Sequence, residues 1–202
     1  MPDNANGYEE HAHDFIRRRD RRIGPDVVGH WIAQLPPGAE VLELGCGHGI
    51  VSQTLVDAGA KLYAVDASPT LLAAFRDRFP QVPTDCSPAE DSTFFARTFD
   101  AVVAWGLIFL MEEPAQRKVL TKAASALRPG GKLLFTAPNQ KCTWIDVMTR
   151  RPSWSLGQDE YESLLRSLGL DVAPGEEDSG GNYYYYATKS KVDEIMNGRP
   201  VT

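Results

Sequence analysis

Short apolar runs alternate with amphipathic stretches along most of this chain, between about residues 39 and 168. The apolar runs predict strands at residues 41–44, 61–66, 82–85, 99–105 and 132–137. The third of these is the weakest, because Pro83 has no N–H group to donate to a neighbouring strand. The amphipathic stretches predict helices at residues 50–58, 69–79, 114–127 and 158–168. This alternation favours an α/β fold, in which helices cover a parallel sheet.

The two ends of the chain depart from the alternation. Residues 170–174 and 182–189 flank a turn-rich stretch and therefore predict an antiparallel hairpin. Residues 1–35 predict a helical cap or lid, residues 36–190 the main domain, and residues 191–202 a loosely held tail.

The charge balance of the chain is mildly acidic. Its 202 residues include 21 Lys and Arg against 27 Asp and Glu, a formal net charge of −6. Phosphate contacts need clustered cations, so we expect no nucleic-acid partner. Five of the arginines nevertheless crowd into residues 17–22, so the remainder of the chain is more acidic than the total suggests.

The cysteines and the apolar runs indicate in which cellular compartment the protein is expected. Cys46, Cys86 and Cys142 are too few and too scattered for a disulfide framework or a zinc knuckle. The longest apolar run, residues 101–111, falls short of the ~18–20 residues that span a bilayer. The N-terminus lacks the basic-then-apolar pattern of a secretory signal. We therefore expect a cytoplasmic protein with reduced thiols and no membrane partner.

The most informative stretch joins the first predicted strand to the first predicted helix. Residues 41–50 read Val-Leu-Glu-Leu-Gly-Cys-Gly-His-Gly-Ile, with glycines at alternate positions after Glu43. Alternate glycines allow a tight turn and a close ligand approach, and the helix start adds free N–H groups. A dinucleotide loop of the Gly-x-Gly-x-x-Gly type needs a glycine where Ile50 stands. A tight turn without a ligand is the other interpretation.

The pattern Glu-x-Gly-x-Gly-x-Gly resembles the signature loop of the class I S-adenosylmethionine-dependent methyltransferases. Residues 99–106 and 127–132 resemble that family's fourth strand and its turn into the fifth, and the resemblance covers roughly residues 39–189. It implies a Rossmann-like, mostly parallel seven-stranded sheet with an antiparallel C-terminal hairpin and helices on both faces. It also implies S-adenosyl-L-methionine as cofactor and S-adenosyl-L-homocysteine as product.

The resemblance implies cofactor-binding residues on three segments. Those of the glycine loop are Glu43, Gly45, Cys46 and Gly47. At the end of the second strand, Asp66 is suited to accept both ribose hydroxyls, with Ala67 beside it. Each such bond contributes about 1.5–3 kcal/mol, although an acid here also serves NAD enzymes. Ala89 and Glu90 are the adenine-side candidates, unless they only begin a helix, and Pro88 stands where the family commonly has an acid.

Two further cofactor contacts are implied in the lid. The pattern Arg-x-x-x-Ile-Gly at Arg19 is similar to one in small-molecule methyltransferases, where the arginine meets the cofactor's carboxylate. Tyr8 is expected to close the same pocket. A solvated basic helix face is the alternative interpretation of this segment.

The acceptor is expected above the end of the fourth strand. Trp105 is there to contact the cofactor and to stack on a flat acceptor, or merely to pack at the strand end. His11 and His13 of the lid are the histidines placed to act as a catalytic base. No metal site is predicted.

The insert at residues 138–157 is expected to wall the acceptor pocket together with the lid. Its side chains Trp144, Met148 and Trp154 favour an apolar or aromatic small molecule, unless they pack beneath the insert.

The predicted function is methyl transfer to an oxygen or nitrogen of a small-molecule acceptor by in-line displacement. A non-catalytic binding or regulatory protein of the same fold is one alternative. An NAD(P)-dependent oxidoreductase is another, disfavoured by Ile50 in the glycine loop. We expect a monomer or a homodimer.

Overall fold

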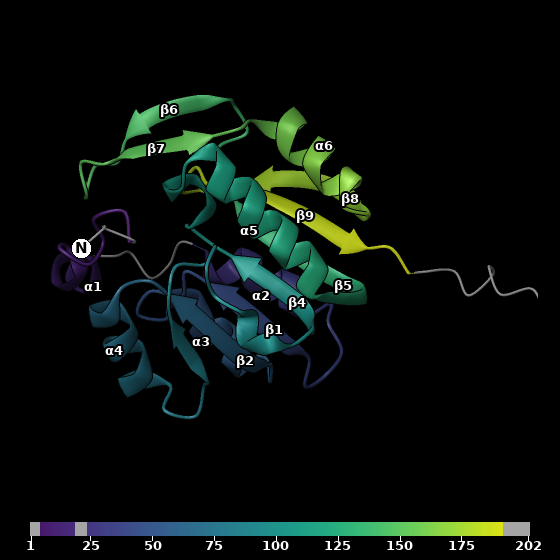
Figure 1. Cartoon of the computed structure of the whole chain (residues 1–202). Coiled ribbons are helices and arrows are strands. Elements are labelled where there is room, and N and C mark those ends of the chain that lie inside the picture. Colours follow the sequence, from purple (N-terminus) through teal and green to yellow (C-terminus); the bar gives the residue numbers. More distant parts are fainter. Residues whose placement is uncertain (1–4, 19–23, 192–202) are drawn as a thin grey trace, which may run out of the picture.

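A seven-stranded sheet forms the centre of the computed structural model, which describes residues 5–18 and 24–191 (Figure 1). Its strands are β1 (Glu40–Leu44), β2 (Lys61–Asp66), β3 (Thr84–Cys86), β4 (Phe99–Ala104), β5 (Leu127–Thr136), β8 (Leu170–Glu177) and β9 (Tyr183–Lys189). Their order across the sheet is β3-β2-β1-β4-β5-β9-β8. The first five pair in parallel, and β9 runs antiparallel to both β5 and β8. The Rossmann-like sheet with its antiparallel C-terminal hairpin is thus confirmed.

Helices connect the strands and pack on both faces of this sheet (Figure 1). They are α1 (Ala12–Arg18), α2 (Pro25–Ile32), α3 (Ile50–Asp57), α4 (Pro69–Arg78), α5 (Glu113–Ala126) and α6 (Gln158–Ser167). Short 3₁₀ turns are η1 (Phe94–Ala96) and η2 (Ile108–Leu110). At the start of α4, Pro69 opens the helix, and the Ser68 hydroxyl accepts the N–H of Leu71 at 3.1 Å.

Alternate side chains of the central strands face two separate apolar cores. Val102 packs in the core that α5 and α6 cover, whereas its neighbours Ala101 and Val103 pack in the core that α2, α3 and α4 cover. A strand buried on both faces needs apolar residues at every position, which explains the apolar run of β4 from residue 101 to residue 104.

Three elements differ from their predictions. β3 begins after Pro83, which cannot donate to the ladder. β5 was expected to begin at residue 132 after a turn at residues 127–131. It begins at Leu127 instead, because that stretch already belongs to the strand and Leu127 pairs with Phe99. The insert holds an unpredicted antiparallel pair, β6 (Cys142–Ile145) and β7 (Pro152–Ser155).

The four consecutive tyrosines of β9 alternate between the two faces of the sheet. Tyr184 and Tyr185 are the fully buried pair, and they point to opposite faces. Both faces of the sheet are covered here, so each face buries one ring. Tyr183 and Tyr186 remain half-buried beside them.

The N-terminal segment lies beside α4 at one end of the sheet, where β6 and β7 also reach (Figure 1). The predicted division into lid, main domain and tail stays a prediction. Arg19 and residues 192–202 of the tail lie outside the described residues. Within the described ranges, no helix combines the length and the apolar character needed to cross a bilayer.

Candidate functional site: a cavity at the carboxyl ends of the strands

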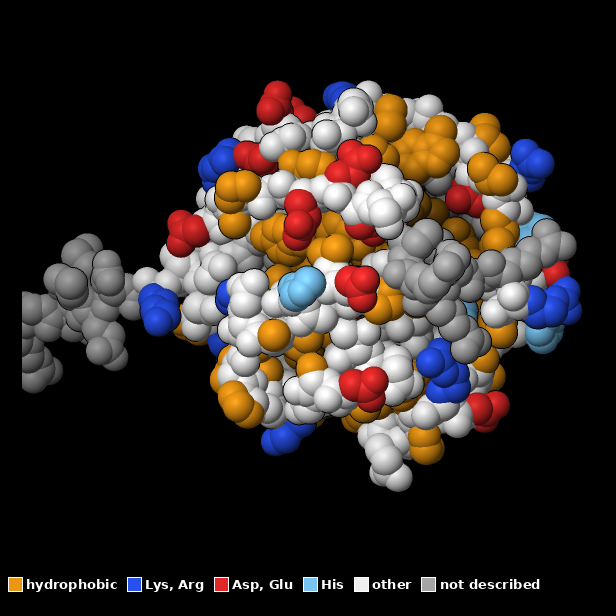
Figure 2. All heavy atoms as spheres, turned by 180° about the vertical axis from the view of Figure 1, so that it is seen from behind, with side chains coloured by type: hydrophobic (Ala, Val, Ile, Leu, Met, Phe, Trp, Pro, Cys, Tyr) orange, Lys and Arg blue, Asp and Glu red, His pale blue; other side chains and the backbone are white. Residues whose placement is uncertain are grey.

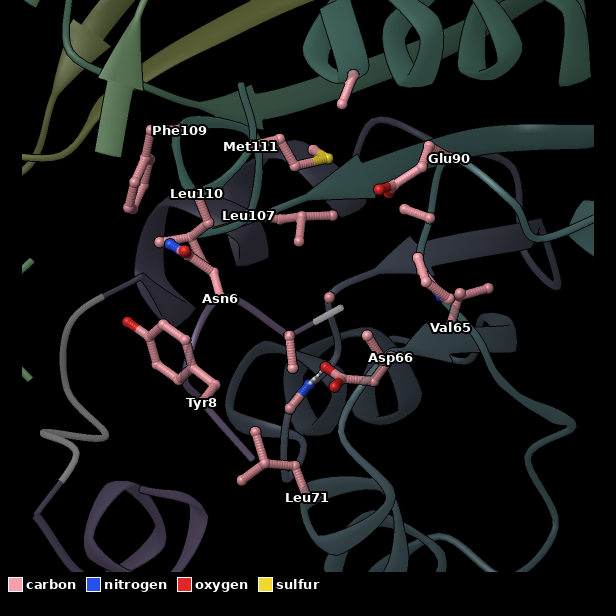
Figure 3. Close-up of a pocket in the computed structure, with 18 of the residues that line it drawn as sticks. Asn6, Tyr8, Val65, Asp66, Leu71, Glu90, Leu107, Phe109, Leu110 and Met111 are labelled. Atoms are coloured by element: carbon pink, nitrogen blue, oxygen red, sulfur yellow. Dashed lines mark hydrogen bonds between the residues drawn. The ribbon is translucent and has the colours of Figure 1, made fainter. Parts of the chain in front are cut away.

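A cavity of about 530 Å³ opens at the carboxyl ends of β1, β2 and β4 (Figure 3). Five stretches of chain line it: the glycine loop after β1, residues 65–67, residues 87–90, residues 105–112 and the N-terminal segment. Side chains from α4, from α5, from the insert and from the β8–β9 turn complete the wall. In open α/β sheets, ligands bind at this edge, beside the point where the strand order reverses.

The glycine loop lies on the floor of this cavity. Gly45 has a φ of +70° and donates its N–H to the carbonyl of Val65 at 2.8 Å, which ties the loop to β2. A Cβ on Gly45 would stand 2.9 Å from the Cβ of Leu107. Both the conformation and the close approach therefore require glycine at this position.

Asp66 is held in place by two backbone N–H groups. Its Oδ2 accepts the N–H of Gly47 at 2.7 Å, the bond drawn in Figure 3, and its Oδ1 accepts that of Ser68 at 2.8 Å. The side chain is only 8% exposed, and burial raises the pKa of its carboxyl although both hydrogen bonds oppose this. Each oxygen keeps a further lone pair, so the carboxylate can still accept two hydroxyl groups on its cavity side.

Glu43 and Cys46 lie behind the loop and are not among the residues that line the cavity. Glu43 is fully buried, and its Oε2 accepts the hydroxyl of Ser52 at 2.6 Å. Burial raises the pKa of Glu43 to about 8, and its Oε1 has no hydrogen-bond partner among the described residues. Burial also raises the pKa of the Cys46 thiol. These two residues thus support the loop from beneath.

The turn after β3 forms the wall beyond Asp66. Ser87, Pro88, Ala89 and Glu90 line the cavity there. The carbonyl of Pro88 accepts the N–H groups of Asp91 at 3.0 Å and Ser92 at 2.9 Å, which closes the turn. The predicted adenine-side residues are therefore brought to the same cavity as Asp66 and the glycine loop (Figure 3).

The N-terminal segment closes another side. Asn6, Tyr8 and Phe15 line the cavity, and the ring of Tyr8 meets that of Phe15 edge-on at 5.2 Å. Glu9 fastens the segment to α4, since its carboxylate accepts the hydroxyl of Ser68 and both the N–H and the hydroxyl of Thr70, at 3.1 and 2.6 Å. Burial raises the pKa of Glu9, but these hydrogen bonds outweigh it and hold the pKa below its usual value.

The opposite end of the cavity is lined mainly by apolar side chains. Residues Leu107, Phe109, Leu110 and Met111 line it directly after β4 (Figure 3), with Trp154 of β7 beside them. Trp144 packs on Phe109 at 5.6 Å between ring centroids. Met148 is not among the lining residues.

Trp105 also lines the cavity. Its indole N–H donates to the hydroxyl of Tyr184 at 2.9 Å, and that hydroxyl donates to Asp178 at 2.8 Å. Gly24 approaches so closely that a Cβ there would stand 2.6 Å from the indole ring. His11 and His13 are not among the residues that line the cavity.

Several lining residues were missed in the sequence: Asn6, Phe15, Phe109, Met111 and Asn182. One signal for Phe109 and Met111 was present, because the apolar run continues past the predicted end of the fourth strand. Asn6, Phe15 and Asn182 carry no comparable signal, since a tertiary contact brings each to the cavity.

Acidic side chains set the charge of the cavity. Asp66, Glu90, Glu112 and Asp146 line it, and no Lys, Arg or His is among its described lining residues. Figure 2 shows acidic side chains around exposed apolar ones on the hollowed face of the molecule. No group of described His, Cys, Asp and Glu side chains has a geometry that holds a metal ion. The wall suits a ligand with a positive charge, such as a sulfonium ion.

Comparisons with known proteins agree with this geometry. A family model described as a methyltransferase domain matches residues 41–131. The ubiquinone biosynthesis O-methyltransferase of Xanthomonas axonopodis is 33% identical over 110 residues, which make up 52% of this chain and 45% of that protein. An uncharacterized methyltransferase of Synechocystis is 26% identical over 157 residues, 73% of this chain and 74% of that one.

The fold is similar to that of magnesium protoporphyrin IX methyltransferase from Synechocystis, whose crystal structure contains bound S-adenosylmethionine. The TM-score is 0.73 at 16% identity, over 94% of this chain and 99% of that chain. The match to the Xanthomonas relative spans about half the length of that protein. The domain match, the sheet order and the glycine loop with Asp66 agree with one another. Residues 41–131 of this chain therefore match a methyltransferase domain, and the fold is similar to that of S-adenosylmethionine-dependent methyltransferases.

Proposed function

We propose that this chain binds S-adenosylmethionine in the cavity and transfers its methyl group to a small-molecule acceptor. The observation that carries the proposal is the bond between Asp66 and the N–H of Gly47, at 2.7 Å. It joins the glycine loop to the acid at the end of β2 and sets both on the wall of one cavity.

The residues present fit the cofactor part by part. Asp66 offers two carboxylate oxygens to the ribose hydroxyls, and residues 87–90 offer a wall to the adenine. The glycine loop has no side chains at Gly45 and Gly47, so the rest of the cofactor has room to lie against the loop backbone. The four carboxylates of the wall complement the positive sulfur. When bound, the cofactor supplies a methyl group activated by a sulfonium leaving group.

The acceptor we propose is a small molecule with an apolar or aromatic body. Phe109, Met111 and Trp154 give the acceptor end its apolar surface, and pockets for such molecules are lined in this way. Two of the similar proteins are named for small molecules, one as a ubiquinone biosynthesis O-methyltransferase and one as a magnesium protoporphyrin IX methyltransferase. The reacting atom is an oxygen or a nitrogen.

The chain contributes chiefly by orientation. Trp105 lines the cavity, and its bond to Tyr184 fixes the indole, so that its ring limits how an acceptor can approach. Holding the nucleophile in line with the methyl group removes about 7–11 kcal/mol of the barrier. The lid and the apolar wall keep water away from the reacting atoms. An oxygen nucleophile also has to lose a proton. His11 and His13 remain proposed bases, and Asp146 is a carboxylate on the acceptor wall itself.

The test is transfer of isotope-labelled methyl from S-adenosylmethionine into fractionated metabolite pools. The expected result is a labelled small molecule that forms with the unmodified chain and not with Asp66→Ala. Binding of S-adenosylhomocysteine without transfer to any pool would favour the non-catalytic alternative. Binding of NADH in its place would favour the oxidoreductase.

A further inference from the structure

Lys122 of α5 is bonded to the outer side of the turn that lines the adenine end of the cavity. Its Nζ donates to the carbonyls of Ala89 at 3.0 Å, Glu90 at 2.9 Å and Ser92 at 2.6 Å. An ammonium group has three N–H donors, so these three carbonyls use all of them. The same Nζ lies 4.5 Å from the centroid of the Phe94 ring. Burial lowers the pKa of Lys122 from its usual value.

These bonds fix the direction of the backbone N–H groups. In a trans peptide, the carbonyl of one residue and the N–H of the next point in opposite directions. The Ala89 carbonyl points to Lys122, so the N–H of Glu90 points away from it. In the same way, the Pro88 carbonyl is turned toward the N–H groups of Asp91 and Ser92, which directs the N–H of Ala89 away from them.

The other side of the turn faces the cavity. Ala89 and Glu90 line it, and Figure 3 shows the Glu90 side chain reaching into it. No residue in the described part of the chain accepts a hydrogen bond from the N–H of Ala89 or Glu90. The turn therefore presents N–H donors and one carboxylate acceptor together.

This pairing of donor and acceptor matches one edge of adenine. Adenine has a ring nitrogen that accepts a hydrogen bond beside an amino group that donates one. Hypoxanthine reverses both, with a ring N–H beside a carbonyl oxygen. A backbone N–H and the Glu90 carboxylate can satisfy adenine, whereas hypoxanthine leaves like groups facing each other.

We propose that Lys122 is a positioning residue for base recognition: by holding the carbonyls of Ala89, Glu90 and Ser92, it sets the turn that selects adenine. This inference rests on the proposed binding of S-adenosylmethionine. Lys122 itself is not placed against the ligand, since α5 lies behind the turn and its ammonium is bonded to the carbonyls there.

Lys118, on the preceding turn of the same helix, provides a matched control. It contacts the same segment through Asp91 at 3.2 Å, but the two side chains are 55% and 64% exposed. An exposed ion pair of this kind contributes little. Lys118→Met removes the same charge from the same helix without touching a carbonyl of the turn.

The experiment is calorimetric titration of S-adenosylhomocysteine and of S-inosylhomocysteine, its hypoxanthine counterpart. The unmodified chain, Lys122→Met and Lys118→Met are compared. We expect Lys122→Met to lose at least about tenfold in affinity for the adenine ligand and to lose much of its preference over hypoxanthine. Lys118→Met should stay within about twofold of the unmodified chain for both ligands.

The outcomes separate this inference from the proposed function. If the unmodified chain binds neither ligand, the proposed function fails. If it binds S-adenosylhomocysteine and Lys122→Met binds equally well, or weakens both ligands by the same factor, Lys122 does not position the turn and the function stands. Thermal unfolding without ligand checks that each variant is folded. Should Lys122→Met not fold, Lys122→Gln, with two donors instead of three, takes its place, and a smaller loss of preference is expected.

Discussion

The two ends of the cavity are built in different ways. At the end that we propose holds the adenosyl group (the adenosyl end), hydrogen bonds fix the main shaping elements: Asp66 accepts from Gly47 and Ser68, and Lys122 donates to the turn after β3. At the acceptor end, apolar side chains such as Phe109 and Trp154 meet by packing, and they come from the segment after β4 and from the insert. Ligand binding at the adenosyl end therefore depends on the directions of hydrogen bonds, and ligand binding at the acceptor end depends on the shape of an apolar wall.

This difference teaches how each end responds to change. A hydrogen-bonded group whose partner is removed stays buried and unsatisfied, so its loss is felt sharply and locally. An apolar wall tolerates exchange of one side chain for another of similar volume, with small effects elsewhere. The adenosyl end should therefore be intolerant of substitution, and the acceptor end adaptable.

The largest expected effect comes from Asp66. Asp66→Ala removes the acceptor for the ribose hydroxyls and leaves the N–H groups of Gly47 and Ser68 without their partner. We predict a loss of at least about tenfold in affinity for S-adenosylhomocysteine, measured by calorimetry. Asp66→Asn keeps the shape of the side chain and one acceptor oxygen. Its affinity for S-adenosylhomocysteine should therefore lie between that of the unmodified chain and that of Asp66→Ala. An unchanged affinity in Asp66→Ala would mean that the ribose lies elsewhere.

Glu43 is a buried acid behind the glycine loop, so the stability of this end of the cavity should depend on pH. Its pKa is about 8 in the folded chain, against a usual value of 4.5. Between these values the unfolded chain has lost the proton and the folded chain keeps it. The free energy of unfolding must therefore fall as pH rises through this window, by up to about 1.4 kcal/mol per pH unit.

Urea unfolding across the same window checks this prediction. Glu43→Gln has no proton to lose, so its free energy of unfolding should fall less steeply with pH than that of the unmodified chain. Glu177→Gln, at an exposed glutamate of β8, controls for the change in net charge. Parallel curves for Glu43→Gln and the unmodified chain would show that Glu43 is ionised in the folded state at neutral pH.

The smallest expected effect on the cofactor comes from the acceptor end. Phe109→Ala removes a half-buried ring that lines the cavity and packs on Trp144. We predict that affinity for S-adenosylhomocysteine stays within about twofold, because no bond at the adenosyl end depends on this ring. Calorimetry under the conditions used for Asp66→Ala makes the comparison direct. A loss of affinity as large as that of Asp66→Ala would show that the two ends of the cavity do not act independently.

Gly45, Gly47 and Asp66 line one cavity, as their local spacing in the sequence predicted, and their contacts with the cofactor stay predictions. The glycines at alternate positions after Glu43 and the acid at the end of β2 lie on single connections between a strand and a helix. Parallel strands then bring these connections to one edge of the sheet. The family model and the sheet order confirm the resemblance that this spacing indicated.

Less of the acceptor end could be predicted, although Trp154 of the insert lines the cavity as expected. The β6–β7 pair and Asn182 reach the cavity through tertiary contacts between segments far apart in the chain. Lys122 is missed for the same reason, because an isolated lysine on a helix carries no signal for three carbonyls on another segment. The catalytic roles of His11, His13 and Trp105 stay predictions.

The most direct test of the central claim is thermal unfolding with S-adenosylhomocysteine or NADH present. At about a hundred times its dissociation constant, a ligand that binds the folded chain adds about 2.7 kcal/mol of stability. For a chain of this size, that raises the Tm by roughly 5–10 °C. We predict such a shift with S-adenosylhomocysteine and none with NADH. A shift with NADH and none with S-adenosylhomocysteine would contradict the account.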